Sequence, residues 1–328
     1  MPPYPFAANE RVSAAMKIIS RKFGRLSMRA ARNAFSRGRN GPPHPFLALS
    51  PGGSFRGRTS WGLRSRNSAC PGMRDGLIRN PIHQNTVPEG TMTIPAWQYD
   101  EMKQIGTDYE NEDEVRRYDE RMGAFRDRAA EVDVIIRALK LEYDHRIMEI
   151  GCGTAEFAMR AAEFCREVIA VDISPVMISY AKKKAAARDL DNITFVHAGF
   201  LTCEHAGPPL DAVVTELALH HLPDFWKLVA LRRIADMLVT GGMLYLRDIV
   251  FSVKLDSYEK ALSFAVEDFR KVAGDETARN FERHIRQEFS TYDWIMEEML
   301  YRAGFDIIDA AYGDHCMATY RCRKVEGR

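Results

Sequence analysis

The sequence predicts an α/β protein with a doubly wound, mostly parallel sheet, and three observations carry that prediction. Between residues 112 and 250, short apolar runs with the length of buried strands alternate with longer stretches that place apolar residues at helical spacing. Two glycines, Gly151 and Gly153, directly follow the first of these runs, and Asp172 ends the second. Ligands bind such sheets at the carboxyl ends of the strands, so these residues mark a candidate site.

The first predicted elements run from residue 112 to 189. An amphipathic helix is expected up to Leu139, because apolar residues recur there at helical spacing: Val115, Tyr118, Met122, Phe125, Ala129, Val132, Ile135, Ile136 and Leu139. The strand HRIMEI and the helix GTAEFAMRAAEFC follow, and then the strand EVIAVDI. The next helix, SPVMISYAKKKAAARD, begins with Ser174 as its N-cap and Pro175 at its first position.

The remaining elements extend to residue 324. The runs ITFVHAGF, LDAVVTEL and GMLYLRDIV predict strands, and DFWKLVALRRIADML predicts a helix that the sequence TGG is expected to end. Residues 251–290 predict a helical insertion, which forms a helical cap. The segment YDWIMEEMLYRA predicts a last helix that stops at Gly304, and two more strands, FDIIDAAYG and HCMATYRCRK, complete the pattern.

Residues 1–91 have a different composition from the rest of the chain. They are rich in arginine and in turn-forming residues, their only acids before Glu89 are Glu10 and Asp75, and no helical or strand period is sustained. Three interpretations are open: an organellar transit peptide, a basic arm that binds nucleic acid, or a segment outside the natural protein. We favour the last, because MTIPAWQYDEMKQIGTDY, from Met92, has the pattern of a natural beginning. The predicted domains are therefore residues 1–91 and 92–328.

Net charge, hydropathy and the pattern of cysteines limit the classes to which the protein can belong. The net charge of the whole chain is +1, so the part after the basic segment is acidic. No apolar run approaches the roughly 18 residues of a membrane span. The six cysteines form no CxxC pair, which favours reduced thiols in a cytosol-like compartment. We expect a cytoplasmic protein, or an imported one if the N-terminal segment is a transit peptide.

The glycine turn restricts the ligand. A dinucleotide fold requires a third small residue three positions after the second glycine, where this chain has Glu156. That carboxylate and Glu149 would repel a pyrophosphate, and no Gly-Lys-Ser/Thr sequence follows as in phosphate-binding loops. Asp172 lies 23 residues beyond Glu149, the spacing at which an acid meets ribose hydroxyls in such sheets. An adenosine that carries a sulfonium and an amino-acid tail satisfies these demands.

Residues 149–250 resemble the class I S-adenosylmethionine-dependent methyltransferases, and the region from Met92 resembles small bacterial members of unassigned substrate. IMEIGCGTAE is similar to the first motif of that family, and VIAVDISPVMISYAKKKA to the second. DAVVTELALHHLPD is similar to its fourth-strand motif, and ADMLVTGGMLYLRD to the turn into its fifth strand. The resemblance implies a Rossmann-like sheet of seven strands whose last strands pair antiparallel at one edge, and S-adenosyl-L-methionine as cofactor.

The resemblance also implies which residues bind the cofactor. Gly151 and Gly153 let the backbone approach its methionine part, Glu149 helps to place its amino-acid end, and Asp172 accepts hydrogen bonds from the ribose hydroxyls. Ala155 replaces the usual third glycine. No acid stands at the end of the third strand, where many relatives hold the adenine amino group. The complete set of implied binding residues is Glu149, Gly151, Cys152, Gly153, Asp172, Ile173, Met177, Gly199, Phe200, Thr215, Glu216 and Leu217.

The sequence indicates catalytic and metal-binding residues less clearly than cofactor-binding residues. His221 stands where the family often has a histidine near the cofactor, and it is a candidate general base. Tyr118, on the first amphipathic helix, is a second candidate. His220 and His221 are not expected to bind a metal ion, because adjacent side chains on a helix point apart and no acidic cluster accompanies them.

The sequence predicts an enzyme that methylates an oxygen, nitrogen or sulfur nucleophile of a small molecule. The acidic catalytic part shows no basic stripe interleaved with aromatic residues, so nucleic acid is not its expected partner. The alternative hypothesis is a protein directed to RNA through the basic N-terminal segment, which either methylates it or senses the cofactor.

Overall fold

The structure is a computed structural model that describes residues 95–103, 113, 115, 116, 119, 127–313 and 316–327. The predicted N-terminal segment 1–91 and the boundary at Met92 lie outside the described residues. Among those residues, no helix combines the length and the apolar character that crossing a membrane requires.

Seven strands form the main sheet in the order β3-β2-β1-β4-β5-β9-β8. The first five are parallel, and β9 pairs antiparallel with both β5 and β8. The predicted doubly wound sheet with antiparallel last strands is therefore confirmed. Its strands are β1 (Arg146–Ile150), β2 (Glu167–Asp172), β3 (Ile193–His197), β4 (Leu210–Glu216), β5 (Leu238–Asp248), β8 (Phe305–Gly313) and β9 (Met317–Lys324).

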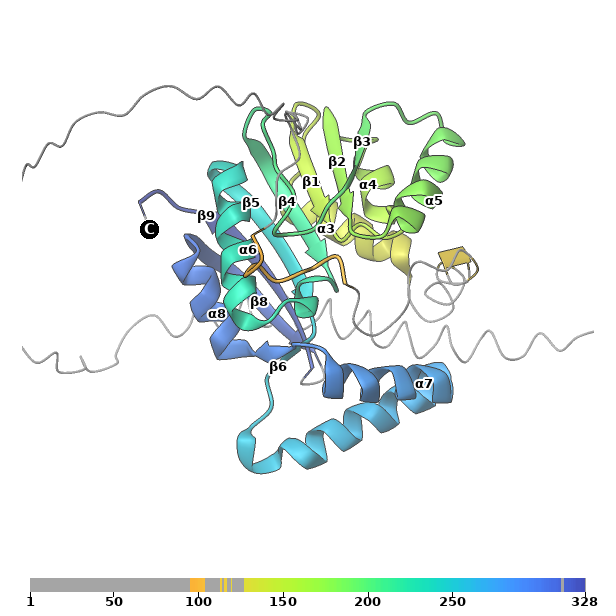
Figure 1. Ribbon diagram of the computed structural model, residues 1–328, viewed down its shortest axis with the longest axis vertical. Coiled ribbons are helices and arrows are strands. Elements are labelled where there is room, and N and C mark those ends of the chain that lie inside the picture. The colour runs from red at the N-terminus through yellow and green to blue at the C-terminus, as the bar shows by residue number, and fades with distance from the viewer. Residues whose placement is uncertain are drawn as a thin grey trace, which may run out of the picture. The chain divides into compact units, whose positions relative to one another are not determined.

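Helices cover both faces of this sheet (Figure 1). One buried cluster joins the sheet to α3 (Arg128–Leu139), α4 (Glu156–Ala161) and α5 (Pro175–Ala186). A second cluster joins the other face to α6 (Asp224–Met237) and α8 (Asp293–Arg302). The strands contribute to both clusters, since alternate side chains of a strand point to opposite faces. Burial on both faces leaves the carboxyl ends of the parallel strands as the place where polar side chains can gather.

The predicted helical cap is present between β5 and α8. It contains η2 (Leu255–Ser257) and α7 (Tyr258–Gln287), whose helical course is interrupted at Gly274 with φ +86°. The two halves of α7 form a hairpin (Figure 1), with a small core around Ala265, Phe281 and Cys316. Short strands on either side of the cap, β6 (Val250–Phe251) and β7 (Thr291–Tyr292), pair in parallel, so the insertion enters and leaves at one place.

Two local predictions are wrong. The helix expected from residue 112 to Leu139 is not continuous, because α3 starts at Arg128, where the Asp127 carboxylate caps it by accepting a hydrogen bond from Ala130 N at 3.1 Å. The sequence TGG does not end α6, which stops at Met237. Thr240–Gly242 lies within β5, in a bulge between the partners of Leu210 and Ala212, and Gly241 supplies the positive φ of +86° that the bulge requires.

Candidate active site

The site begins at the turn that follows β1. The amides of Gly151 and Cys152 both donate to the carbonyl oxygen of Val171, at 2.8 and 2.9 Å, which ties the turn to the end of β2. Gly151 and Gly153 have φ values of +78° and +52°, a region that disfavours side chains with a β-carbon. A β-carbon on Gly151 would stand closer than 3.0 Å to the β-carbon of Ala218, whereas one on Gly153 would meet nothing within 4 Å. The first glycine is required by packing, and the second opens onto empty space.

Asp172 connects this turn to the next helix. One carboxylate oxygen accepts a hydrogen bond from Gly153 N at 2.7 Å, and the other accepts one from Ser174 N at 2.8 Å. Ser174 in turn caps α5, since its hydroxyl oxygen accepts from Met177 N at 3.1 Å. The carboxylate therefore organises the backbone of two loops, besides any contact that it makes with a ligand.

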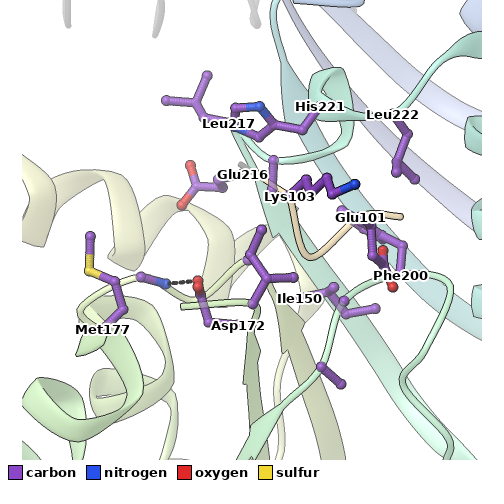
Figure 2. A pocket seen from close by; sticks show the side chains of 16 residues that line it. Glu101, Lys103, Ile150, Asp172, Met177, Phe200, Glu216, Leu217, His221 and Leu222 are labelled. Carbon is purple, nitrogen blue, oxygen red and sulfur yellow. Dashed lines mark hydrogen bonds between the residues drawn. The ribbon is translucent and has the colours of Figure 1, made fainter. Parts of the chain in front are cut away.

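A cavity lies at the carboxyl ends of β1, β2 and β4, with an empty volume of about 910 Å³ that includes its open mouth. Met177 lies on one side of it and Glu101, Phe200 and Leu222 on the other, with Asp172 between them (Figure 2). Most of the predicted binding residues line the cavity: Gly151, Gly153, Asp172, Ile173, Met177, Gly199, Phe200, Glu216 and Leu217. Residues far apart in the sequence thus converge on one space.

Three predicted binding residues do not line the cavity. Cys152 packs in the core between the sheet and α3 to α5. Thr215 is buried within β4, and its hydroxyl has no hydrogen-bond partner among the described residues. Glu149 is buried, and its carboxylate accepts a hydrogen bond from Ala158 N at 3.0 Å, near the start of α4. The candidate base His221 does line the cavity, whereas Tyr118 lies outside the described residues.

Glu101 is a site residue that sequence analysis missed. Its carboxylate accepts hydrogen bonds from Leu201 N at 2.9 Å and Thr202 N at 2.8 Å, in the loop after β3, and a further one from the Thr202 hydroxyl. A β-carbon on Gly199 would collide with this carboxylate. The absence of a side chain at Gly199 therefore makes room for an acid from elsewhere in the chain. No local pattern around Glu101 indicated this, because its partners lie about 100 residues away.

The cavity has an acidic lining. Glu101, Asp172 and Glu216 contribute carboxylates, and Lys103 is the one lysine or arginine among the described residues that line it. Behind the lining, burial and then the charge of Glu216 raise the pKa of Glu149 well above its ordinary value. A cationic ligand would relieve this concentration of negative charge, whereas phosphate groups would add to it.

The residues present fit S-adenosyl-L-methionine. Gly153 faces open space where a ligand can approach the backbone, and the carboxylate of Asp172 stands beside it at the end of β2. Ile173 and Met177 offer apolar surface for an adenine ring, and the acidic lining suits a sulfonium and an ammonium group. The cofactor supplies an activated methyl group when it is bound.

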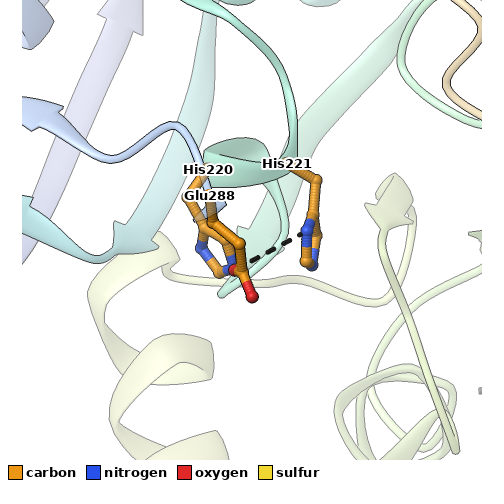
Figure 3. Close-up of side chains that lie close together, drawn as sticks. All are labelled: His220, His221 and Glu288. Atoms are coloured by element: carbon orange, nitrogen blue, oxygen red, sulfur yellow. Dashed lines mark ion pairs between the residues drawn. The ribbon is translucent and has the colours of Figure 1, made fainter. Parts of the chain in front are cut away.

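Next to the cavity, His220 and His221 lie in a cluster of ionisable side chains (Figure 3). They occupy the short 3-10 helix η1 (Leu219–His221), and their ring centroids are 4.3 Å apart. Nε2 of His220 lies 3.2 Å and Nδ1 of His221 lies 3.8 Å from the same Glu288 carboxylate oxygen. The expectation that these side chains point apart and lack acidic neighbours is therefore wrong, because the cap places Glu288 against them.

The cluster continues into the core on both sides. Nδ1 of His220 hydrogen-bonds Asp248, which is buried and also accepts from the His220 amide. Nδ1 of His284 lies 2.6 Å from Glu288, and its Nε2 lies 2.7 Å from the Ser290 hydroxyl. Both ring nitrogens of His220 and of His284 therefore have close protein partners, as do the carboxylates of Asp248 and Glu288.

The cluster determines the charge of its imidazoles. Burial opposes a charge on His220, but Asp248 and Glu288 raise its pKa on balance to about 9. Burial and the neighbouring charge of His220 lower the pKa of His221 to about 4. Burial raises the pKa of Glu288, but hydrogen bonds from His220 and His284 bring it below its ordinary value. His221 is therefore neutral at pH 7, and its lowered pKa makes it a weak base there.

Comparison with known proteins agrees with this geometry. The sequence model of the methyltransferase domain family matches residues 147–242, from β1 into β5. This chain contains a class I S-adenosylmethionine-dependent methyltransferase domain. The matched segment contains the glycine turn, Asp172 and both histidines, but neither Glu101 nor Glu288.

The methyltransferase resembles several curated and solved proteins. An uncharacterized methyltransferase of Geobacillus kaustophilus is 26% identical over 191 residues, which cover 58% of this chain and 81% of the relative. The 27-O-demethylrifamycin SV methyltransferase of Amycolatopsis mediterranei is 30% identical over 120 residues, which cover 36% of this chain and 43% of the relative. The crystal structure of the N-methyltransferase NodS from Bradyrhizobium japonicum, in complex with S-adenosyl-L-homocysteine, has 18% identity and a TM-score of 0.44. The match covers 62% of this chain and 88% of NodS.

Proposed function

We propose that this methyltransferase transfers the methyl group of S-adenosyl-L-methionine to an oxygen, nitrogen or sulfur nucleophile of a small molecule. The cavity at the ends of β1, β2 and β4 is the observation that carries the proposal. Its lining combines apolar surface from Ile173, Met177 and Phe200 with three convergent carboxylates, which is typical of small-molecule and cofactor sites. One relative is named for such an acceptor, 27-O-demethylrifamycin SV.

The charge of the catalytic part supports a small molecule rather than RNA. Residues 92–328 contain 42 acidic and 31 basic residues. Nucleic-acid sites depend on clustered lysine and arginine that neutralise phosphates, and the cavity is instead lined by three carboxylates. The alternative, an RNA-directed methyltransferase or a cofactor sensor that uses the basic N-terminal segment, is tested by the same experiment.

Alignment is the main chemical task in this proposal. The methyl group of a sulfonium is already activated, so the protein contributes mostly by holding the acceptor in line and by excluding water. The cap reaches the border of the cavity through Glu288, which lies beside His221. We therefore assign selection of the acceptor to the cap and to residues 95–103, which bring Glu101 and Lys103 to the cavity.

A metabolite screen with methyl-labelled cofactor tests the proposal. The protein is incubated with fractions of a small-molecule extract and, separately, with total RNA, and the labelled product is identified by mass spectrometry. We expect label in a small molecule, with equal activity from a chain truncated to begin at Met92, and no label with Asp172→Ala. Label confined to RNA, and lost on truncation, would establish the alternative.

A further inference from the structure

We propose that His220, His221 and Glu288 form a binding site for one divalent transition-metal ion, with Zn²⁺ as the best fit. The site lies at the border between the cofactor cavity and the helical cap. This inference is independent of the identity of the methyl acceptor, because it concerns binding that can be measured without any acceptor.

The separations of the three ligand atoms suit a tetrahedral ion. Bonds of about 2.0–2.2 Å to nitrogen and oxygen place neighbouring tetrahedral ligands about 3.3 Å apart. The observed separations from the Glu288 oxygen are 3.2 Å to His220 Nε2 and 3.8 Å to His221 Nδ1, and all three atoms lie within 4.8 Å of one another. Ligation requires the His221 ring, whose side chain is 33% exposed, to bring Nδ1 closer to the Glu288 oxygen than the present 3.8 Å.

Two of the three ligands have buried partners that orient them. Asp248 holds Nδ1 of His220, which directs Nε2 of that ring toward Glu288. Nε2 gives up its proton when it binds the ion, so binding of Zn²⁺ releases that proton to solvent. Nδ1 of His284 holds the Glu288 carboxylate from the other side. Metal-ligating histidines and carboxylates usually have such partners, since these hold the ligand atom at its position before the ion arrives.

The backbone around Glu288 is also held against the histidines. The amide of Phe289 donates to the carbonyl oxygen of His220 at 2.9 Å, and Lys227 donates to the Phe289 carbonyl. Thr291 donates to Asp224 at 3.0 Å. The segment that supplies the carboxylate is therefore positioned by several contacts besides the ion pairs of Glu288 itself.

The donor set selects the class of metal. Two imidazoles and one carboxylate suit zinc and its neighbours among the transition metals, whereas Mg²⁺ and Ca²⁺ prefer oxygen ligands alone. Three protein ligands leave one position of a tetrahedron open, as in zinc sites of the His₂Glu type. One of the ligands, His221, also lines the cofactor cavity, so a bound ion links the cap to the wall of that cavity.

A second cluster in the described part of the chain provides a matched control. Glu142, Asp144 and His145 also bring three ligand atoms within 4.8 Å of one another, but they are exposed or half-buried and adjacent in sequence. Nδ1 of His145 accepts a hydrogen bond from Glu142 N at 3.2 Å, which occupies one of its ring nitrogens. No buried carboxylate orients this group as Asp248 orients His220.

Zinc titration of the full chain tests the proposal. The protein is stripped with a chelator and titrated with ZnCl₂ in competition with a chromophoric chelator, and Co²⁺ is titrated in parallel to record the visible absorption of a tetrahedral site. We expect one equivalent of zinc, none of Mg²⁺, and loss of the site with His221→Gln or Glu288→Gln. Asp248→Asn should weaken zinc binding 10- to 100-fold, and His145→Gln should leave it unchanged.

The outcomes separate this site from the alternatives. Absence of stoichiometric zinc, or zinc binding that survives His221→Gln, would show that the cluster is a network of ion pairs alone and would overturn the proposal. Loss of zinc with His145→Gln would assign the ion to the exposed cluster and would overturn it as well. Far-UV circular dichroism of each variant in chelator controls for folding, and His221→Gln removes the most exposed ligand if Glu288→Gln unfolds the cap.

Discussion

Gly151 offers a quantitative test of the glycine turn. Replacing it by alanine places a β-carbon at φ +78°, which costs about 1–2 kcal/mol for an L-residue in the left-handed region. The same β-carbon would stand closer than 3.0 Å to that of Ala218, and overpacking of this kind costs about 1–3 kcal/mol. We therefore expect Gly151→Ala to lower the free energy of unfolding by about 2–5 kcal/mol.

Two further variants separate the strain from the collision. Gly153→Ala has a similar positive φ of +52° but meets nothing within 4 Å, so it should cost only about 1–2 kcal/mol. Combining Gly151→Ala with Ala218→Gly removes the collision, so the double variant should be about 1–3 kcal/mol more stable than the sum of the single effects predicts.

Urea unfolding followed by circular dichroism, without cofactor, measures these free energies. Additivity of the two changes within about 0.5 kcal/mol, or equal effects at Gly151 and Gly153, would refute the packing argument. Binding of S-adenosyl-L-methionine by calorimetry adds a second criterion. Gly153→Ala projects its methyl group into the cavity and should weaken binding far more than its small effect on stability suggests.

Three further predictions concern the carboxylates of the site. Asp172→Ala should weaken cofactor binding and also lower the free energy of unfolding by about 2–3 kcal/mol, since it removes two backbone hydrogen bonds to a charged group; unchanged stability by urea unfolding would contradict this. Glu101→Ala should cost about 2–4 kcal/mol because it leaves two loop amides without their acceptor, and calorimetry should show weaker cofactor binding. Because the pKa of Glu149 is raised in the folded state, this group favours folding below its unfolded pKa of about 4.3, and that contribution is lost as pH rises through its folded pKa. Glu149→Gln should therefore reduce the loss of folding stability as pH rises above about 4.3, and it should weaken cofactor binding. An unchanged profile of stability against pH would contradict a raised pKa of Glu149.

The structure changes one expectation about Asp172. Its place at the end of β2 predicts a role in cofactor binding. Its carboxylate instead bonds the amides of Gly153 and Ser174, so the residue has a structural role beside any role in binding. The sequence could not reveal this, because a carboxylate at the end of a strand can accept hydrogen bonds either from a ligand or from backbone amides.

The sequence by itself determined the sheet and the central residues of the candidate site. The alternation of apolar runs and helical patterns predicts parallel strands joined by helices, and topology then brings the turn at Gly151 and Gly153 beside Asp172. The two glycines lie in the turn after β1 and Asp172 ends β2, and neighbouring parallel strands end at the same edge. Their meeting follows from local pattern and handedness alone.

Only the tertiary structure decided the parts of the site that come from outside the alternating strands and helices. Glu101 reaches the loop after β3 across about 100 residues, and Glu288 contacts the two histidines from the C-terminal end of the cap. Neither carboxylate lies in a local pattern that indicates its partner, since an isolated glutamate in a polar stretch usually faces solvent. The short 3-10 geometry that brings the rings of His220 and His221 together also depends on packing, because Asp248 and Phe289 hold that segment from two sides. Contacts between distant segments arise only when the chain has folded, so pattern and spacing cannot specify them.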